Sequence, residues 1–362
     1  MLLVSKGRPA TAVGGLLLAE SIPAFLAPVL GTVSDRMDRR TAMIGCELGQ
    51  ALVYSAIAAW LPPYAGLLAL VGVASLLSRT FSAASKSSIP ALVERDDLMP
   101  ANALVNTVFN LQIALGAALG GLLVSITGER TAIAIDAASF LVSALIMLAL
   151  PAVPRSAGAG DGGFRSEVRE GIVYVFGDPL LRTLVASMFA FVMFASLDNV
   201  AVVFLVRNVL RGGSFAYGMA MSAFGIGMIV ATLTLVRRSR VRPTTLVLVG
   251  MVFTASGNLL VGLAPAIGFA IGFQLLGGVG NGLSLVGEDT LLQQRVPEHL
   301  MGRVFGAAAS AIFIGSTVAY TGGGVLVDAT SPRTALIASG IAVFAVAAFA
   351  WPAISRAATA RA

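Results

Sequence analysis

Apolar segments of about 20 residues or more alternate with short polar loops along nearly the whole chain. A helix of about 20 residues is long enough to cross the hydrocarbon core of a bilayer. The segments lack the strict apolar and polar alternation that is typical of a membrane barrel. The pattern therefore predicts an all-α polytopic membrane protein.

The pattern predicts eleven membrane helices in two sets, separated by a polar, glycine-rich stretch. The approximate ranges are 10–33, 41–62, 64–88, 101–126 and 131–152 in the first set, and 182–206, 215–236, 244–263, 265–290, 303–327 and 333–354 in the second. We expect an N-terminal helical half at 1–152, a cytoplasmic linker at 153–181 and a C-terminal helical half at 182–362.

An internal repeat relates the two sets. The segment GGLLVSITGERTAI from Gly120 returns as GGVLVDATSPRTAL from Gly323, with eight identities at an offset of 203 residues. This offset carries the helix at 182–206 to positions before Met1, so we expect the natural protein to have twelve helices and this chain to lack the first. The alternative is a signal peptide at 1–30 with Lys6 and Arg8 as its basic end, although its apolar run exceeds a normal signal core and no small-residue cleavage site precedes the polar loop.

Composition supports this class of protein, because 57% apolar residues, 12% charged residues and a mean hydropathy of +0.89 lie outside the range of soluble domains. The net charge of +6 is explained by loop arginines, most of which fall on the side expected to be cytoplasmic. We expect the C-terminus on that side as well. We expect a multi-pass protein of the cell inner membrane that contacts the lipid bilayer and binds no nucleic acid. With Cys46 and His299 as the only cysteine and histidine, we expect no intrachain disulfide, no metal site and no cofactor.

The loop after the first helix of the chain combines a glycine, an aspartate and three arginines: Gly31, Asp35, Arg36, Arg39 and Arg40. A glycine allows close helix approach, and a carboxylate at a helix end can pair with arginines or with the N-terminus of a facing helix. The loop resembles the major facilitator superfamily signature G-x-x-x-D-R-x-G-R-R/K, with Asp38 where the family usually has glycine. The alternative, that the arginines only anchor the topology, leaves the glycine and the aspartate unexplained.

Further segments resemble the transmembrane secretion effector branch of that superfamily, which includes enterobactin-exporter-like and macrolide-efflux-like members. They are Ile89–Val93 with Ala101–Leu104, Gly116–Gly121, Asp136–Phe140, and Val296–Glu298 with Gly302–Val304. The run with Gly116, Gly120 and Gly121 also resembles the antiporter motif G-P-x-x-G-G, with Ala117 replacing the proline. Ordinary packing of small residues between helices is the alternative interpretation of this run.

Ionisable side chains are few within the apolar helices, and each is costly there unless it is paired or faces water. In the resembled fold, the first, fourth, seventh and tenth helices line a central cavity. Asp198 is our first choice for a carboxylate that takes up and releases protons as its access to water changes, and Glu20 is the second. Further candidates for coupling or substrate binding are Arg79, Asn199, Gln274 and Asn281. Asp198 could instead form a structural hydrogen bond or contact a cationic substrate directly.

The repeat also suggests a gate, because the offset places Glu288 and Asp289 at positions equivalent to Ser85 and Lys86. These residues lie at the expected cytoplasmic ends of two pseudo-symmetric cavity helices. We hypothesise that Lys86 forms an inner gate pair with Glu288 or Asp289. The alternative is that all three side chains extend into water at the membrane interface.

The resemblance implies a monomeric secondary transporter that works by alternating access between two six-helix halves. It implies efflux of a drug, siderophore or other amphipathic small molecule in exchange for protons, and no enzyme activity. Uptake of a metabolite is a second transport hypothesis, which the antiporter-like glycine run disfavours. A membrane scaffold or receptor that transports nothing, and an inactive truncated product, remain as hypotheses of a different class.

Overall fold

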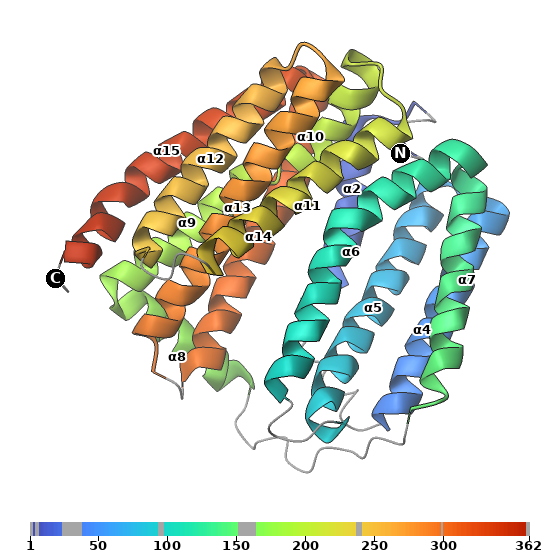
Figure 1. Ribbon diagram of the computed structural model, residues 1–362, viewed down its shortest axis with the longest axis horizontal. Coiled ribbons are helices and arrows are strands. Elements are labelled where there is room, and N and C mark those ends of the chain that lie inside the picture. Colours follow the sequence, from blue (N-terminus) through green and yellow to red (C-terminus); the bar gives the residue numbers. More distant parts are fainter. Residues whose placement is uncertain are drawn as a thin grey trace. The chain divides into compact units, whose positions relative to one another are not determined.

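The computed structural model describes residues 3, 7–23, 38–92, 98–150, 164–236, 241–297 and 300–359, and these residues form helices joined by short turns (Figure 1). Among them, nine helices are long and apolar enough to cross a membrane, and Ala10–Ser21 and Leu115–Thr127 are shorter apolar helices. Each of these segments falls within or overlaps one of the predicted ranges. The all-α polytopic fold is therefore confirmed.

The helices of the first sequence half are α2 (Ala10–Ser21), α4 (Arg39–Trp60), α5 (Tyr64–Leu92), α6 (Leu98–Thr127) and α7 (Glu129–Met147). The next elements are α8 (Phe164–Gly177), α9 (Pro179–Ala195), α10 (Asp198–Phe204) and the π-helical η3 (Leu205–Val209). The last are α11 (Ser214–Val236), α12 (Pro243–Leu263), α13 (Ile267–Arg295), α14 (Met301–Ala329) and α15 (Pro332–Thr359). Helix α13 extends beyond the predicted end at 290, because backbone hydrogen bonding rather than hydropathy determines where a helix ends.

The bounds of the helices follow the same offset of 203 as the sequence repeat. Adding 203 to the bounds of α5 gives 267–295, which are the bounds of α13. Adding it to the first residues of α6 and α7 gives the first residues of α14 and α15. The repeat therefore extends from the sequence to the helical framework.

Two equivalent arginines make the same contacts in the two repeats. Arg130, at the start of α7, donates through Nε and Nη2 to two backbone carbonyls at the end of α4, at 2.7 Å each. Arg333, at the start of α15, donates through Nη1 and Nη2 to two backbone carbonyls at the end of α12, at 2.8 Å each. Each guanidinium thus satisfies carbonyls that a helix end leaves without intrahelical partners.

The chain divides into two compact units. The larger comprises Met1–Gly14, Ile113–Gly121 and Gly162–Ala362, and the smaller comprises Gly15–Gln112 and Leu122–Asp161. In the smaller unit, α4 packs against α5 and α7 (Figure 1), and the rings of Tyr54 and Phe140 stack at 5.3 Å between centroids.

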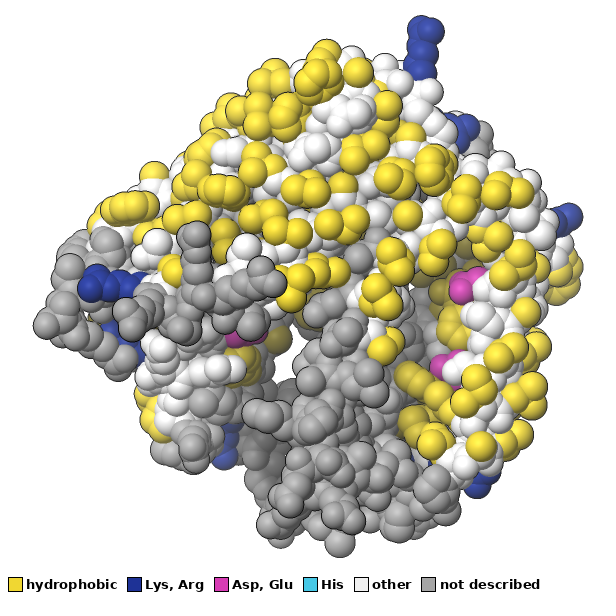
Figure 2. Space-filling model, in the orientation of Figure 1, with side chains coloured by type: hydrophobic (Ala, Val, Ile, Leu, Met, Phe, Trp, Pro, Cys, Tyr) yellow, Lys and Arg dark blue, Asp and Glu magenta, His cyan; other side chains and the backbone are white. Residues whose placement is uncertain are grey.

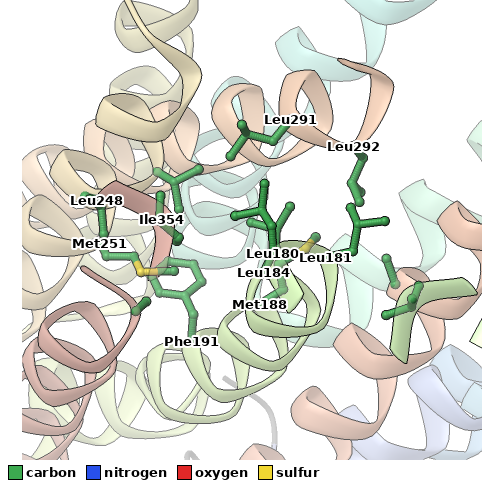
Figure 3. Close-up of a cluster of buried hydrophobic side chains, with 14 of the residues drawn as sticks. Leu180, Leu181, Leu184, Met188, Phe191, Leu248, Met251, Leu291, Leu292 and Ile354 are labelled. Carbon is green, nitrogen blue, oxygen red and sulfur yellow. The ribbon is translucent and has the colours of Figure 1, made fainter. Parts of the chain in front are cut away.

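Helix α13 is the centre of the packing in the larger unit, where it contacts both α11 and α12. Glycines allow this close approach, since a Cβ added at Gly278 would lie 1.9 Å from the carbonyl oxygen of Phe224. A Cβ added at Gly280 would lie 2.3 Å from the backbone nitrogen of Thr254. An apolar core joins α9, α12, α13 and α15 and includes Leu181, Leu184, Met251, Leu292 and Ile354 (Figure 3).

Large apolar side chains also cover much of the outside of the helices. Trp60, Phe349 and Ile126 are 82%, 80% and 73% exposed. Figure 2 shows hydrophobic side chains spread widely over the visible described surface, with few charged ones among them. A soluble monomer rarely exposes apolar area on this scale, whereas the lipid-facing side of a membrane protein does. The molecule is therefore a multi-pass membrane protein.

Candidate functional site

A cavity of about 130 Å³ lies inside the larger unit, between the segment α9–α10 and the helices α11, α12 and α13. Its walls combine aromatic and aliphatic side chains with a few polar ones. The lining residues are Phe191, Val192, Ala195, Ser196, Asp198, Asn199, Met221, Phe224, Thr254 and Asn281. A mainly apolar pocket with a few convergent polar groups is the usual form of a small-molecule site.

The carboxylate of this cavity lies at an interruption between two helices. Helix α9 ends at Ala195 and α10 begins at Asp198, and in the turn between them the backbone nitrogen of Asn199 donates to the carbonyl of Ser196 at 3.2 Å. Asp198 therefore occupies the first turn of α10, where the helix dipole favours a negative charge. Broken helices of this kind form binding sites near the midplane of many transporters.

Asp198 is the one charged residue among those that line the cavity, and it is only 8% exposed. The neighbouring polar groups are partly occupied, since Thr254 donates to the carbonyl of Gly277 at 3.3 Å. The amide of Asn199 donates to the carbonyl of Ser196 at 3.4 Å. Chemically, the site offers a carboxylate that can bind a proton or pair with a cation, beside the half-buried amide of Asn281.

The structure brings three of the predicted site residues together, Asp198, Asn199 and Asn281. Gln274 is on the same helix as Asn281 and is 1% exposed, but it does not line the cavity. Glu20 and Arg79 are exposed residues of the smaller unit, where the backbone carbonyl of Glu20 accepts a hydrogen bond from a serine of α5. The cavity therefore includes neither of these two residues.

The residues of the hypothesised inner gate differ in their surroundings. Glu288 on α13 is only 4% exposed, and Asp289 beside it is half-buried. Lys86 lies on α5, and its side chain is outside the described part of the structure. The pairing of Lys86 with either carboxylate stays a prediction.

Only the end of the signature loop is described, because Gly31, Asp35 and Arg36 lie outside the described residues. Asp38 forms the N-cap of α4 with φ −61° and ψ 124°, and its side chain accepts the backbone N–H of Thr41 at 2.9 Å. This hydrogen bond from Thr41 lowers the pKa of Asp38. The backbone there is extended, so this position does not require the glycine that is usual in the family.

The two arginines that follow Asp38 lie in the first turn of α4. Arg39 is buried, at 5% exposure. Arg40 donates through Nε to the carbonyl of Met147 at 3.2 Å and through Nη2 to the carbonyl of Leu148 at 2.5 Å. A cation at these carbonyls stabilises the C-terminus of a helix. Arg40 thus joins α4 to the end of α7, which stops at Met147 although the predicted apolar segment continues to 152.

The glycines of the antiporter-like run have different environments within the larger unit. A Cβ added at Gly121 would lie 2.6 Å from the carbonyl oxygen of Ser214, and one at Gly218 would lie 2.3 Å from that of Ala117. Among the described residues, a Cβ at Gly116 or Gly120 would meet nothing within 4 Å. Gly121 therefore has a direct role in the packing of α6 against α11.

Sequence reasoning missed the apolar walls of the cavity, formed by Phe191, Met221 and Phe224, and also Thr254. A signal was present for one of them, because Phe191 precedes Asp198 by seven residues and would share its face in the continuous helix that the sequence predicts. No comparable signal links residues of α11 or α12 to Asp198. Their contribution depends on how separate helices pack.

In the described part of the chain, no group of three or more His, Cys, Asp or Glu residues could hold a metal.

Comparison with known proteins identifies relatives of this helical framework. The family model of the Major Facilitator Superfamily matches residues 7–319. YfiS of Bacillus subtilis (strain 168), an uncharacterized MFS-type transporter, is 28% identical over 348 residues, which cover 90% of this chain and 80% of YfiS. The enterobactin exporter EntS of Escherichia coli is 26% identical over 282 residues, which cover 78% of this chain and 65% of the exporter.

The fold also matches solved structures. A bacterial homologue of the iron transporter ferroportin, crystallised in an inward-facing state, aligns with a TM-score of 0.74 and 15% sequence identity. The alignment covers 98% of this chain and 92% of the homologue. At this level of identity the match establishes a shared fold.

Proposed function

The chain belongs to the Major Facilitator Superfamily, and from this premise we propose that it exports an amphipathic small molecule in exchange for protons, with Asp198 as the coupling carboxylate. The predicted resemblance of the chain to this family, with the enterobactin exporter among its relatives, is confirmed. The proposal further assigns residues 1–152 and 182–362 to the two halves that alternate access, with 153–181 as their linker. The proposal also places the protein in the cell inner membrane, with its C-terminus in the cytoplasm.

The observation that supports this proposal most directly is the cavity around Asp198. A carboxylate in the first turn of α10 is enclosed by Phe191, Met221 and Phe224. An ionisable side chain within a membrane helix is costly, so its presence at a cavity points to a functional role. When water reaches the cavity from one side and then from the other, Asp198 can bind and release a proton on opposite sides of the membrane.

Efflux is the proposed direction because the enterobactin exporter is among the relatives of this chain. The aromatic and thioether walls of the cavity suit the apolar part of an amphipathic molecule. A cavity of about 130 Å³ holds only a small group, so we propose that it receives one part of a larger substrate.

The proposal can be tested in bacteria that overproduce the chain, using a lipophilic cationic dye, a macrolide and a catecholate siderophore as probes. We expect lower accumulation of at least one probe than in cells without the chain, and loss of this effect when a protonophore collapses the proton gradient. Asp198→Asn should abolish export, because an amide cannot release a proton at neutral pH. Asp198→Glu should retain part of it, and Glu129→Gln, which alters a carboxylate outside the cavity, should leave export unchanged.

The direction of any change separates export from the competing functions. Increased accumulation would indicate uptake, and unchanged accumulation of every probe would favour a scaffold or receptor that transports nothing. Equal export by the wild type and by Asp198→Asn would exclude Asp198 as the coupling carboxylate.

The inner gate is retained as part of the proposal, with Asp289 as the partner of Lys86. Asp289 is half-buried, whereas Glu288 is almost fully enclosed and so is less suited to a contact that forms and breaks. Lys86→Glu and Asp289→Lys should each reduce export, and the two together should restore it. Failure of this rescue would contradict the gate.

A further inference from the structure

Four polar residues recur at intervals of seven along α13, namely Gln274, Asn281, Glu288 and Arg295. Seven residues are nearly two turns of an α-helix, so these side chains lie on one face and drift by about 20° at each step. The run of 21 residues rises about 32 Å, close to the thickness of the hydrocarbon core of about 30 Å. We call these four residues the α13 polar stripe.

Two residues of the α13 polar stripe line separate spaces in the larger unit. Asn281 lines the cavity that contains Asp198. Arg295 lines a recess of about 580 Å³ at the end of α13, together with Arg182 and the N-cap residue Asp178 of α9. Glu288 is seven residues from each of these lining positions. It therefore lies midway along α13 between the cavity and the recess.

Two residues of the stripe, Gln274 and Glu288, are buried, and each has a polar atom that is not satisfied. Glu288 is 4% exposed, and its Oε1 has no hydrogen-bond partner among the described residues. Gln274 is 1% exposed, and its Nε2 likewise lacks a partner in the described part of the chain. Buried polar atoms without partners are rare and costly, so each calls for a functional explanation or a partner that arrives in another state.

The helices around α13 bring few charges to the interior. Between Ser214 and Val236 of α11 and between Pro243 and Leu263 of α12, the only titratable side chain is that of Tyr217. Besides Glu288, the titratable side chains of α9, α10, α13 and α14 are those of Arg182, Asp198, Asp289, Arg295, Arg303, Tyr320 and Asp328. Of the carboxylates on these helices, Asp198 and Glu288 are the two that are buried.

We propose that Glu288 is a second proton-binding residue, which relays protons between Asp198 and the recess at Arg295. The relay rests on the proposed proton coupling at Asp198. About 10 Å of helix separate Asn281 from Glu288, so the proton moves through water beside the stripe rather than by direct contact. Polar residues on one face of α13 line the cavity at one position and the recess at another. The proposed role explains why a buried carboxylate lies between these two positions.

Each step of the relay conserves protons and charge. The O–H bond of protonated Asp198 breaks, a water accepts that proton, and the water chain delivers a proton to the carboxylate of Glu288, where a new O–H bond forms. Asp198 is then ionised and Glu288 is neutral. Glu288 next gives its proton to water in the recess, and Asp178 and the two arginines there keep that opening hydrated.

The relay can be tested on the purified full chain without knowledge of the substrate. Infrared difference spectroscopy after a pH jump follows the C=O stretch of protonated carboxyl groups. Among the bands of buried carboxyl groups, which include Glu47 of α4, we expect one to be lost in Asp198→Asn and a different one to be lost in Glu288→Gln. In Glu288→Gln the remaining Asp198 band should respond more slowly, by about 100-fold, because a positioned proton carrier has been removed.

Control variants separate the relay from a structural role. Glu288→Asp retains a carboxyl group and should restore most of the rate, whereas a loss of rate from misfolding would not be rescued by the shorter acid. Glu129→Gln, which removes a carboxylate elsewhere in the chain, should keep both bands and the wild-type rate. Should Glu288→Gln misfold, Glu288→Asp with its shifted carboxyl band still identifies which band belongs to Glu288.

The outcomes distinguish the relay from the function on which it rests. An Asp198 band that responds at the wild-type rate in Glu288→Gln would overturn the relay and leave proton coupling at Asp198 intact. An Asp198 band that never responds to pH in the wild type would overturn both proposals. A single titrating band assigned to Asp198, with Glu288 permanently ionised or permanently protonated, would also overturn the relay.

Discussion

Helices α5 and α13 have the same length and equivalent places in the two repeats, but they carry different chemistry. At the positions equivalent to the α13 polar stripe, α5 has Val71, Ser78, Ser85 and Leu92. The backbone pattern is thus shared, whereas the ionisable part of the stripe is found in α13 alone. A helical framework can be repeated while only one copy carries the residues of a site, because helix formation depends on the backbone and apolar content rather than on particular polar side chains.

The two helices also differ in how closely they can pack. Gly278 and Gly280 of α13 lie against backbone atoms of α11 and α12, and the equivalent residues of α5 are Ser75 and Leu77. Glycine permits contact between helix backbones, and small residues of this kind are common at the interfaces of membrane helices. The second repeat is therefore more closely packed around its polar stripe.

The largest expected effect tests this close packing. Gly278→Leu places a side chain where even a Cβ would lie 1.9 Å from a backbone oxygen, so we expect loss of most folded protein. Gly272→Leu on the same helix is the matched control, because a Cβ there would meet nothing within 4 Å of the described structure. The measurement is the yield of monodisperse protein and its thermal midpoint in detergent. Equal behaviour of the two variants would show that the crossing of α11 and α13 is wrong.

The next effect tests whether the repeats are equivalent where their sequences agree. Arg130→Ala and Arg333→Ala each leave two carbonyls at a helix end without their guanidinium, and each should reduce the free energy of unfolding by about 2 kcal/mol. Arg8→Ala, at an exposed position, is the control and should have little effect. Thermal or denaturant unfolding in detergent measures all three. A clear effect in one repeat only would contradict the equivalence.

The smallest effect tests a difference between α4 and its counterpart α12. Asp38 caps α4 through its side chain, whereas the N-cap residue of α12, Arg242, makes no such bond. Because the pKa of Asp38 is lowered in the folded state, its stabilisation is complete above its unfolded pKa and is lost as the pH falls through the lowered value. Asp38→Ala should therefore be less stable than the wild type at neutral pH, and the difference should shrink in acid.

Unfolding of the wild type and Asp38→Ala across a pH series measures this effect. Arg242→Ala serves as the comparison, and its stability relative to the wild type should not follow the same acid dependence. A difference between Asp38→Ala and the wild type that stays constant from neutral to acidic pH would contradict the ionised cap.

Much of the fold was predictable because hydropathy reports membrane helices directly. The range predicted at 244–263 differs from α12 by one residue at its start, since Pro243 and the end of an apolar run mark its limits. Helix α7 was predicted to reach 152 but ends at Met147, where Arg40 binds the last carbonyls. That contact joins residues more than a hundred positions apart, and no local pattern in the sequence reports it.

The candidate site was predictable only in part. Asp198 was selected because a carboxylate in an apolar helix is unusual, and the cavity lies beside it. Glu20 satisfied the same rule, but it is exposed in the smaller unit. The number of ionisable residues in the helices can be read from the sequence, whereas the rotation of each helix about its axis cannot. That rotation determines whether a side chain faces a cavity, another helix or the surroundings.

By itself, the sequence determined that this is a helical membrane protein built from a repeat of 203 residues, because both properties depend on composition and order along the chain. The seven-residue spacing of the α13 polar stripe was also present in the sequence. Only the tertiary structure decided that Asn281 lines a cavity with Asp198, that Glu288 is buried, and that Arg295 borders a recess. The physical reason is that burial and proximity arise from packing between distant segments, and the energy of a charge in a membrane depends on those surroundings.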